Sequence, residues 1–249
     1  MTTGIDLLLK TARTRLGGRR VGLLSHQAAL TASGATSAQA LRRALGADLA
    51  ALFGPEHGFF GQAAAGVQTH TRRHPDWNIP VFSLFGACHK PTPRMMRTVD
   101  VVVVDLQDLG ARCYTYLATL NLMLEAAAEA GVPVIVADRP VPLPRAIDGP
   151  VAEPEWFSFV APLPLPMSTA LTPAEAARWI VAERRLDVNL EVVPMRGWRR
   201  EGRRGPDWPD FVPPSPAIRT WECAATYLAT VFSEALPDID CGRGTALGF

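Results

Sequence analysis

The chain is poor in cysteine, in long apolar runs and in net charge, and each shortage excludes a class of protein. The 25 basic and 24 acidic side chains leave a formal charge of +1, which gives no net field to attract nucleic acid. No run approaches the roughly 20 apolar residues that span a membrane. The four cysteines form no Cys-x-x-Cys pair, so a zinc cage is not indicated and we expect reduced thiols at Cys88, Cys113, Cys223 and Cys241.

Several signature motifs are also missing. Residues 25–30, after the first predicted strand, lack the glycines that bring a pyrophosphate to a helix N-terminus. The chain has neither a Walker-type Gly-Lys-Ser/Thr motif nor a Gly-x-Ser-x-Gly nucleophile elbow. We therefore expect no cofactor. The N-terminus lacks the basic and apolar regions of a secretory signal, which predicts a cytoplasmic protein.

What the chain does contain is a regular alternation of strand-like and helix-like segments. Its 249 residues are 48% apolar and 20% charged, as in ordinary soluble globular proteins. The alternation predicts an α/β fold with a doubly wound, mostly parallel sheet flanked by helices. The expected strands are 19–24, 49–53, 80–85, 99–105, 133–137 and 189–193, and the expected helices are 37–45, 114–130 and 172–186.

Capping residues support the predicted helices. Thr36 or Ser37 is placed to cap the first helix, and Gly131 to end the second. The third opens with a capping-box pattern of Thr172 and Glu175. Residues 194–216 are rich in Pro, Arg and Trp and are predicted as a long surface loop covering the sheet edge. Three tryptophans could stack on sugar rings, although anchoring a loop is their more common role: Trp198, Trp208 and Trp221.

Residues 52–59, Leu-Phe-Gly-Pro-Glu-His-Gly-Phe, are the most informative stretch. An apolar strand ends there in a turn that presents Glu56 beside His57. In open α/β sheets ligands bind outside the carboxyl ends of the strands, so polar residues after neighbouring strands should converge in one crevice. Carboxylates flanked by Arg and Tyr suit glycosidic cleavage. The converging set also includes His89, Lys90, Asp105, Gln107, Asp108, Arg112, Tyr114, Tyr116, Asp138, Arg139 and Asp148.

Each of these residues also fits a purely structural role. Asp105 or Asp108 is placed to cap a helix, Asp108 and Arg112 have the spacing of a helical ion pair, and Asp138 with Arg139 fits a turn pair. A further alternative is a divalent metal site in a hydrolase, built from Glu56, His57, Asp105 and Asp108. The spacing of these residues supports a metal only weakly.

Seven segments together resemble a known family. They are residues 53–58, 90–93, 105–112 with 114–116, 138–140, 149–151, 212–216 and 242–245. In order and number they resemble the NamZ-type exo-β-N-acetylmuramidases of bacterial peptidoglycan turnover. The resemblance implies a Rossmann-like catalytic domain at 1–195 that releases N-acetylmuramic acid from non-reducing ends of muropeptide or glycan fragments. It also implies that 196–249 hold a Pro/Arg/Trp-rich loop and the start of a truncated C-terminal domain.

The resemblance also implies roles for individual residues. Glu56 matches the catalytic carboxylate, expected to act as general acid and base. Asp148 stands where a second acid, usually the longer Glu, is expected. The residues expected to bind substrate are His57, Lys90, Asp105, Gln107, Asp108, Arg112, Tyr114, Asp138 and Arg139. A non-catalytic sugar-binding or regulatory module left by truncation is the alternative function, and the stereochemical course and oligomeric state stay open.

Overall fold

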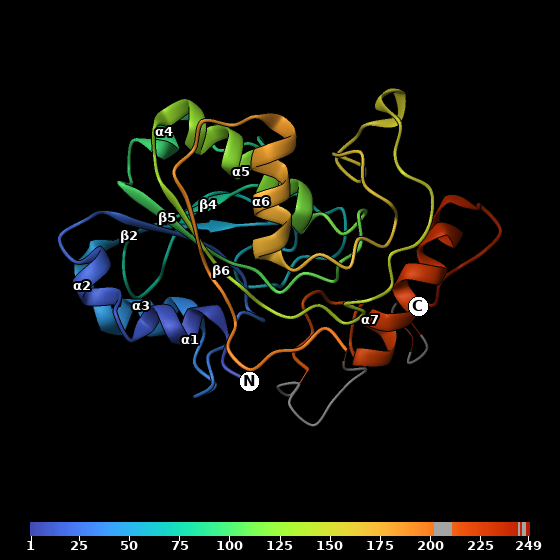
Figure 1. The fold of residues 1–249 in the computed structure, drawn as a ribbon, viewed down its shortest axis with the longest axis horizontal. Coiled ribbons are helices and arrows are strands. Elements are labelled where there is room, and N and C mark those ends of the chain that lie inside the picture. The colour runs from blue at the N-terminus through green and yellow to red at the C-terminus, as the bar shows by residue number, and fades with distance from the viewer. Residues whose placement is uncertain (202–210, 244, 246–247) are drawn as a thin grey trace.

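A seven-stranded sheet forms the centre of the protein (Figure 1), as a computed structural model of residues 1–201, 211–243, 245 and 248–249 shows. The strand order is β3-β4-β2-β1-β5-β6-β7. All neighbours pair in parallel except the edge strand β3, which is antiparallel to β4. The strands are β1 (Val21–Ser25), β2 (Leu49–Gly54), β3 (Arg72–Arg73), β4 (Pro80–Ser83), β5 (Val101–Asp105), β6 (Val134–Ala137) and β7 (Leu190–Val193).

The order of the parallel strands is that of a Rossmann fold. When β3 is left out, the six parallel strands lie in the spatial order 3-2-1-4-5-6 of their chain positions. All six predicted strands are present, with ends that differ from the predicted bounds by one or two residues. The predicted α/β, Rossmann-like sheet is thus confirmed, and the only strand not predicted is the two-residue β3, which is too short to carry an alternating pattern.

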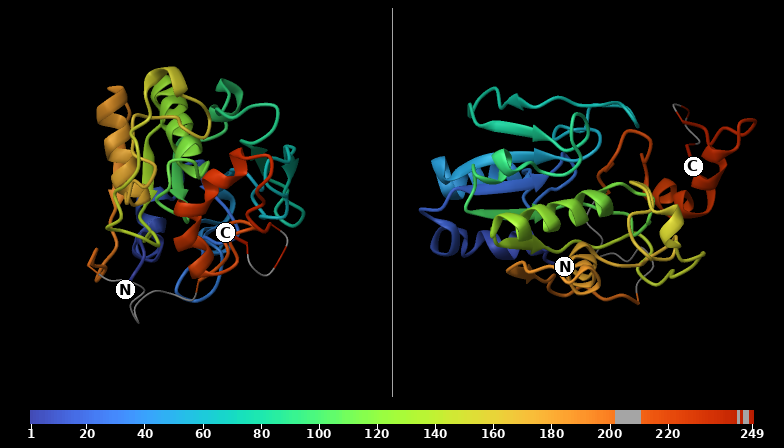
Figure 2. Two further views of the ribbon diagram at one scale, coloured as in Figure 1. Left: turned by 90° about the vertical axis from the view of Figure 1, so that its right-hand side faces the viewer. Right: turned by 90° about the horizontal axis from the view of Figure 1, so that it is seen from above.

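Helices cover both faces of the sheet (Figure 2), which makes the fold doubly wound. One face packs against α1 (Gly4–Leu9), α2 (Ala12–Leu16) and α3 (Ser37–Leu45), and the other against α4 (Pro93–Met96), α5 (Tyr116–Ala130) and α6 (Pro173–Arg184). The central strand β5 serves both cores. Val101 and Val103 face the first layer, and Val102 and Val104 face the second, as the two-residue period of a strand requires.

The predicted helix caps are confirmed. The Thr36 side chain accepts a hydrogen bond from the backbone N–H of Gln39, and Thr172 forms a full capping box with Glu175. Gly131 ends α5 in the left-handed conformation at φ 63°. The described part of the chain contains no helix of the length and apolar character needed to cross a bilayer. All four cysteines are free thiols.

The C-terminal part of the described chain lies beyond the carboxyl ends of the strands (Figure 2). It contains α7 (Trp221–Thr230) and the 3-10 helix η3 (Val231–Ala235), neither of which the sequence predicted. The remaining 3-10 helices are η1 (Gly46–Asp48) and η2 (Pro154–Trp156). Because Ala224 and Tyr227 of α7 are buried in the core on the α5 side, α7 closes one wall of the region where ligands bind in this fold.

Candidate active site

Glu56 is held at the carboxyl end of β2 by donors from two other segments. The chain turns sharply after Gly54, where an added Cβ would lie 2.4 Å from the backbone nitrogen of Phe59, so glycine is required. The Glu56 side chain is buried at 8% exposure. Its Oε1 accepts a hydrogen bond from the Gly66 N–H (2.7 Å), and its Oε2 accepts one from Thr115 Oγ1 (2.7 Å). These contacts fix the carboxylate while one lone pair on each oxygen stays available.

His57 is fixed beside this carboxylate. Its backbone has φ 69°, a left-handed conformation that is uncommon for a residue with a side chain. The ring Nδ1 lies 2.9 Å from the carbonyl oxygen of Ala63, and a carbonyl can only accept. Nδ1 therefore carries a proton, and Nε2 makes no hydrogen bond to any residue that the structure describes. The imidazole can use Nε2 toward a ligand.

An open cavity of about 410 Å³, which we call the Glu56 cavity, lies over these two side chains. Its volume falls within the range usual for small-molecule sites. The cavity lining also includes Glu234 of η3, which accepts a hydrogen bond from Arg243 Nε (2.9 Å). Polar and aromatic side chains complete the lining: His57, Tyr114, Thr115, Ser215, Tyr227 and Arg243.

Tyr114 supplies a hydroxyl to the cavity wall. Its side chain is buried, and the hydroxyl has no partner of good hydrogen-bond geometry among the described residues, although the hydroxyls of Ser215 and Tyr116 are its polar neighbours. Burial raises the pKa of Tyr114 well above its ordinary value, so the phenol stays protonated. An unpaired buried hydroxyl costs free energy unless a ligand or water satisfies it, which marks Tyr114 as a contact for a polar ligand.

The Thr115 hydroxyl gives a direct test of how Glu56 is positioned. Thr115→Val keeps the side-chain shape but removes the only side-chain donor to Glu56 among the described residues. Loss of one hydrogen bond to a charged group predicts a fall in kcat of about tenfold. Thr115→Ser keeps the hydroxyl and should stay within about twofold of wild type. Steady-state hydrolysis of the substrate proposed below measures both, and equal kcat for the Val and Ser variants contradicts the assignment.

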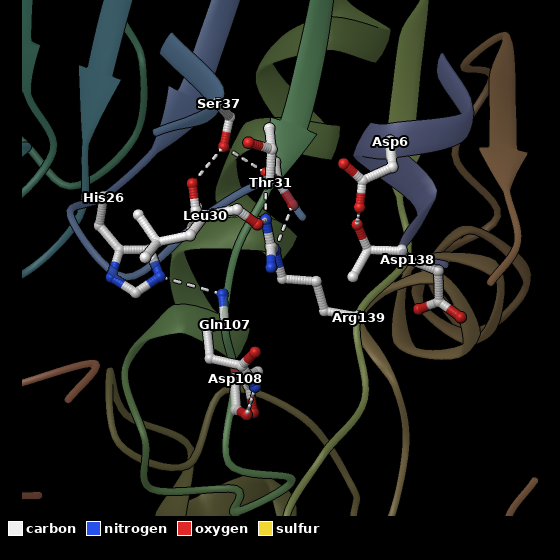
Figure 3. A network of polar contacts seen from close by, with 12 residues as sticks. Asp6, His26, Leu30, Thr31, Ser37, Gln107, Asp108, Asp138 and Arg139 are labelled. Atoms are coloured by element: carbon white, nitrogen blue, oxygen red, sulfur yellow. Dashed lines mark hydrogen bonds and ion pairs between the residues drawn. The ribbon is translucent and has the colours of Figure 1, made fainter. Parts of the chain in front are cut away.

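A neutral histidine joins the site to the sheet, and it was not among the predicted site residues. Gln107 N–H donates to His26 Nε2 (3.0 Å; Figure 3), so the ring proton lies on Nδ1, which faces Tyr116 Oη at 3.2 Å. Tyr116 in turn donates to the carbonyl of Pro214 (2.9 Å). Burial lowers the pKa of His26 to about 3, so the ring is neutral near pH 7. The chain of contacts holds residues 213–215 over the carboxyl end of β1 and places Ser215 in the Glu56 cavity.

Asp105 and Arg139 form an ion pair inside the fold (Figure 3). Arg139 Nε and Nη2 donate to the two oxygens of Asp105 at 2.6 and 2.8 Å, and Nη2 also donates to the Leu30 carbonyl (2.7 Å). Asp105 also contacts the Ser37 hydroxyl and has 0% exposure. Both carboxylate oxygens are occupied, and neither residue lines a described cavity. The two residues tie the ends of β5 and β6 to α3, and contact of either one with substrate stays a prediction.

Asp108 and Asp138 are also directed inward. Asp108 Oδ1 accepts a hydrogen bond from Gly110 N–H (2.7 Å), and Asp138 Oδ1 accepts one from Ala174 N–H (3.1 Å) in the first turn of α6. Burial raises the pKa of Asp138 and raises the pKa of Asp108 to about 7. Neither carboxylate lines the Glu56 cavity. They stabilise the loop after β5 and the N-terminus of α6 respectively, and contacts with sugar stay a prediction for both residues.

The raised pKa of Asp108 predicts a pH-dependent stability. The folded state keeps the proton up to about pH 7, whereas the unfolded chain loses it near pH 4, so stability from this group falls as pH rises between these values. Asp108→Asn cannot ionise. The stability of the variant relative to wild type should therefore improve by on the order of 2 kcal/mol from pH 5 to pH 8. Urea unfolding at both pH values measures this, and a constant difference contradicts the buried, titrating carboxyl.

Comparison with known proteins decides the family. The model for the N-terminal part of exo-β-N-acetylmuramidase NamZ matches residues 21–222. The chain belongs to the NamZ family. It is 40% identical to the peptidoglycan β-N-acetylmuramidase NamZ of Bacillus subtilis (strain 168) over 99% of its own length and 60% of that protein.

Two solved structures share the fold of this NamZ-family chain. Both are DUF1343 family proteins from Bacteroides fragilis, with TM-scores of 0.90 and 0.82 at 34% and 26% identity. Each alignment covers 99% of this chain, but only 63% and 65% of the two solved chains. The chain thus spans somewhat less than two thirds of the relatives that it matches.

Of the residues that the NamZ resemblance assigned, Glu56, His57 and Tyr114 lie together in the Glu56 cavity. Lys90 lies elsewhere, since its ammonium pairs with Glu129 (2.7 Å) on α5. At about 1.5 Å per residue, Glu129 lies roughly 20 Å along the helix from Tyr116. The role of Lys90 in the sugar site stays a prediction, which this position does not support.

Asp148 also lies apart from Glu56. Its side chain is exposed and its Oδ1 accepts a hydrogen bond from Gly149 N–H (2.7 Å). It does not line the Glu56 cavity, where Glu234 is the second carboxylate. A catalytic role for Asp148 stays a prediction that this geometry does not support.

Arg112 and Gln107 bind backbone carbonyls around the site. Arg112 Nη1 donates to the carbonyls of Pro150 (2.8 Å) and Leu165 (2.6 Å). Gln107 Nε2 donates to the carbonyl of Pro140 (2.8 Å). These bonds position the loops after β5 and β6, and contacts with substrate stay a prediction for both residues.

Other expectations from the sequence have mixed outcomes. The residues that the structure describes include no group of three or more His, Cys, Asp or Glu arranged to hold a metal ion. The Arg200 guanidinium carbon lies 5.2 Å from the ring centroid of Trp198, a contact of the kind expected for a tryptophan that anchors a loop. Trp208 lies outside the described residues. The loop predicted to cover the sheet edge instead places residues 213–215 over the carboxyl ends of the strands.

Proposed function

We propose that this chain is an exo-acting glycoside hydrolase that releases N-acetylmuramic acid from the non-reducing ends of peptidoglycan fragments. Membership of the NamZ family and the named activity of the Bacillus subtilis relative support the substrate class. The observation that carries the proposal is the Glu56 carboxylate, which two donors orient at the base of the Glu56 cavity. A cytoplasmic site of action stays a prediction from the sequence.

Glu56 acts as the general acid and base in this proposal. Protonated on a free lone pair, it donates to the glycosidic oxygen as the bond from that oxygen to the anomeric carbon breaks and the sugar takes on oxocarbenium-ion character. Water then forms the new bond to the anomeric carbon and gives its proton back to the Glu56 carboxylate. Thr115 and Gly66 keep the carboxylate in one orientation through both steps. The Tyr114 phenol and His57 Nε2 are placed to contact sugar hydroxyl and amide groups.

Product analysis tests this function. The chain is incubated with fragments that end in N-acetylmuramic acid and, as the matched control, with fragments that end in N-acetylglucosamine. Mass spectrometry should detect release of N-acetylmuramic acid from the first set that is much faster than any release of N-acetylglucosamine from the second. A folded chain that binds the first set but releases no sugar overturns the proposal and supports the non-catalytic sugar-binding module.

A further inference from the structure

A second cavity of about 370 Å³ adjoins the Glu56 cavity, and His57 lines both. It lies over the carboxyl ends of β2 and β4, where the antiparallel edge strand β3 forms one side. We call it the Arg72 cavity. Its lining includes His57, Phe60, His70, Arg72 and Phe82.

The permanently charged group that lines the Arg72 cavity is the Arg72 guanidinium. The lining includes Arg72 and His70 but no carboxylate. The Arg72 guanidinium lies 4.5 Å from the ring centroid of Phe60, which orients it, and it forms no ion pair with the residues that the structure describes. A guanidinium is always charged and presents a planar set of donors that matches a carboxylate. The free charge therefore favours an anionic group.

The floor of the Arg72 cavity is mainly apolar. Phe82 and Val81 line it together with Phe59. The two hydroxyls in the wall are already paired, since Thr69 Oγ1 and Ser83 Oγ lie 2.6 Å apart and both also bond to the backbone of Phe85. The cavity thus offers an apolar surface beneath a cationic rim, which fits an anion carried on a short hydrocarbon arm.

We propose that the Arg72 cavity binds the carboxylate of a short apolar substituent on the sugar whose glycosidic bond is cleaved at Glu56. The inference rests on the proposed function, because the 3-O-lactyl ether of muramic acid has this chemistry: a methyl group and a carboxylate on one carbon. His57 lines both cavities, so the sugar ring in one and its substituent in the other would both contact this residue. Arg72 is then a specificity-determining residue.

The test compares Arg72→Gln with Arg73→Gln. Arg73 is the matched control because it neighbours Arg72 on β3, does not line the cavity, and donates to Asn78. The substrates are 4-nitrophenyl β-N-acetylmuramide and 4-nitrophenyl β-N-acetylglucosaminide, which lacks the lactyl group. Arg72→Gln should raise KM for the muramide about tenfold, with kcat within about twofold. KM for the glucosaminide, and both constants of Arg73→Gln, should not change.

Three results overturn the inference. They are an unchanged KM of Arg72→Gln for the muramide, an equal loss on both sugars, and a loss confined to fragments whose lactyl group is amidated by a peptide.

If the wild-type chain hydrolyses neither glycoside, the proposed function fails. The cavity is then tested separately by calorimetry with N-acetylmuramic acid and N-acetylglucosamine. Tighter binding of the first sugar to wild type, lost in Arg72→Gln but kept in Arg73→Gln, supports the cavity, and equal binding of both sugars overturns it.

Discussion

Glu56→Gln is expected to lower kcat for a β-N-acetylmuramide by about 10²- to 10⁴-fold, the usual contribution of a general acid or base. Glutamine has the same shape, and its amide oxygen can still accept one of the two hydrogen bonds from Thr115 and Gly66. It cannot give up a proton to the leaving oxygen. KM should stay within about threefold, because the contacts that bind the sugar remain. Hydrolysis of phenyl β-N-acetylmuramide, whose basic phenolate is a poor leaving group, by the wild type and the variant measures the effect.

Glu125→Gln is the matched control for this prediction. It makes the same substitution on α5, where Glu125 faces Lys90 at 3.6 Å and does not line the Glu56 cavity. Its kcat should equal that of wild type. A Glu56→Gln enzyme that keeps more than about a tenth of wild-type kcat contradicts the acid-base role.

Asp105→Asn is expected to lower the free energy of unfolding by about 3–5 kcal/mol, the usual cost of removing one partner of a buried ion pair. The substitution leaves the Arg139 guanidinium, itself only 3% exposed, without a counter-charge. An asparagine oxygen can accept one of the two hydrogen bonds, but desolvation of the cation is no longer offset. Urea unfolding at pH 7 measures the change.

Two further variants separate this effect from a general sensitivity to charge removal. Glu129→Gln breaks a solvent-exposed pair with Lys90 and should cost less than about 1 kcal/mol. Asp105→Leu combined with Arg139→Met removes both charges and should recover much of the stability lost in Asp105→Asn. If Asp105→Asn costs no more than Glu129→Gln, the buried pair does not hold the ends of β5 and β6 to α3.

The strands and helix caps could be predicted because their signals are local. A run such as residues 101–104 is apolar at every position, which indicates a strand that is covered on both faces. Thr172 caps a helix through contacts with a residue only three positions away. The short β3 and α4 carry too few residues for a periodic pattern. The boundary expected near residue 196 stays a prediction.

The site was predicted less completely, because the sequence indicates which residues lie at the edge of the sheet but not how deeply each of their side chains is buried. Glu56 follows one buried strand and Asp105 ends another, yet of the two only Glu56 lines a cavity described for the placed residues. Asp105 turns inward because Arg139 follows the next strand and satisfies both of its oxygens. A chain position alone does not distinguish a carboxylate that meets a ligand from one that meets a guanidinium.

The site residues that were not predicted make their contacts with residues far away in the sequence. His26 follows the first strand, so the rule that selected Glu56 could have found it, but its partner Tyr116 lies on α5. Thr115 stands between two tyrosines of the recognised segment 114–116 and touches Glu56 through the fold. Glu234 has no local signal, since the packing of α7 and η3 alone brings it to the Glu56 cavity.

Glu56 is claimed above all to deliver a proton to the leaving oxygen. The most direct test is how the loss of kcat in Glu56→Gln depends on the leaving group. The ratio of wild-type to Glu56→Gln kcat is measured for β-N-acetylmuramides with a series of phenols of decreasing basicity. A good leaving group needs little protonation, so the ratio should shrink by about tenfold or more from the most basic phenol to the least. A ratio that stays the same across the series contradicts the claim, because Glu56 would then support the fold or bind the sugar without donating the proton.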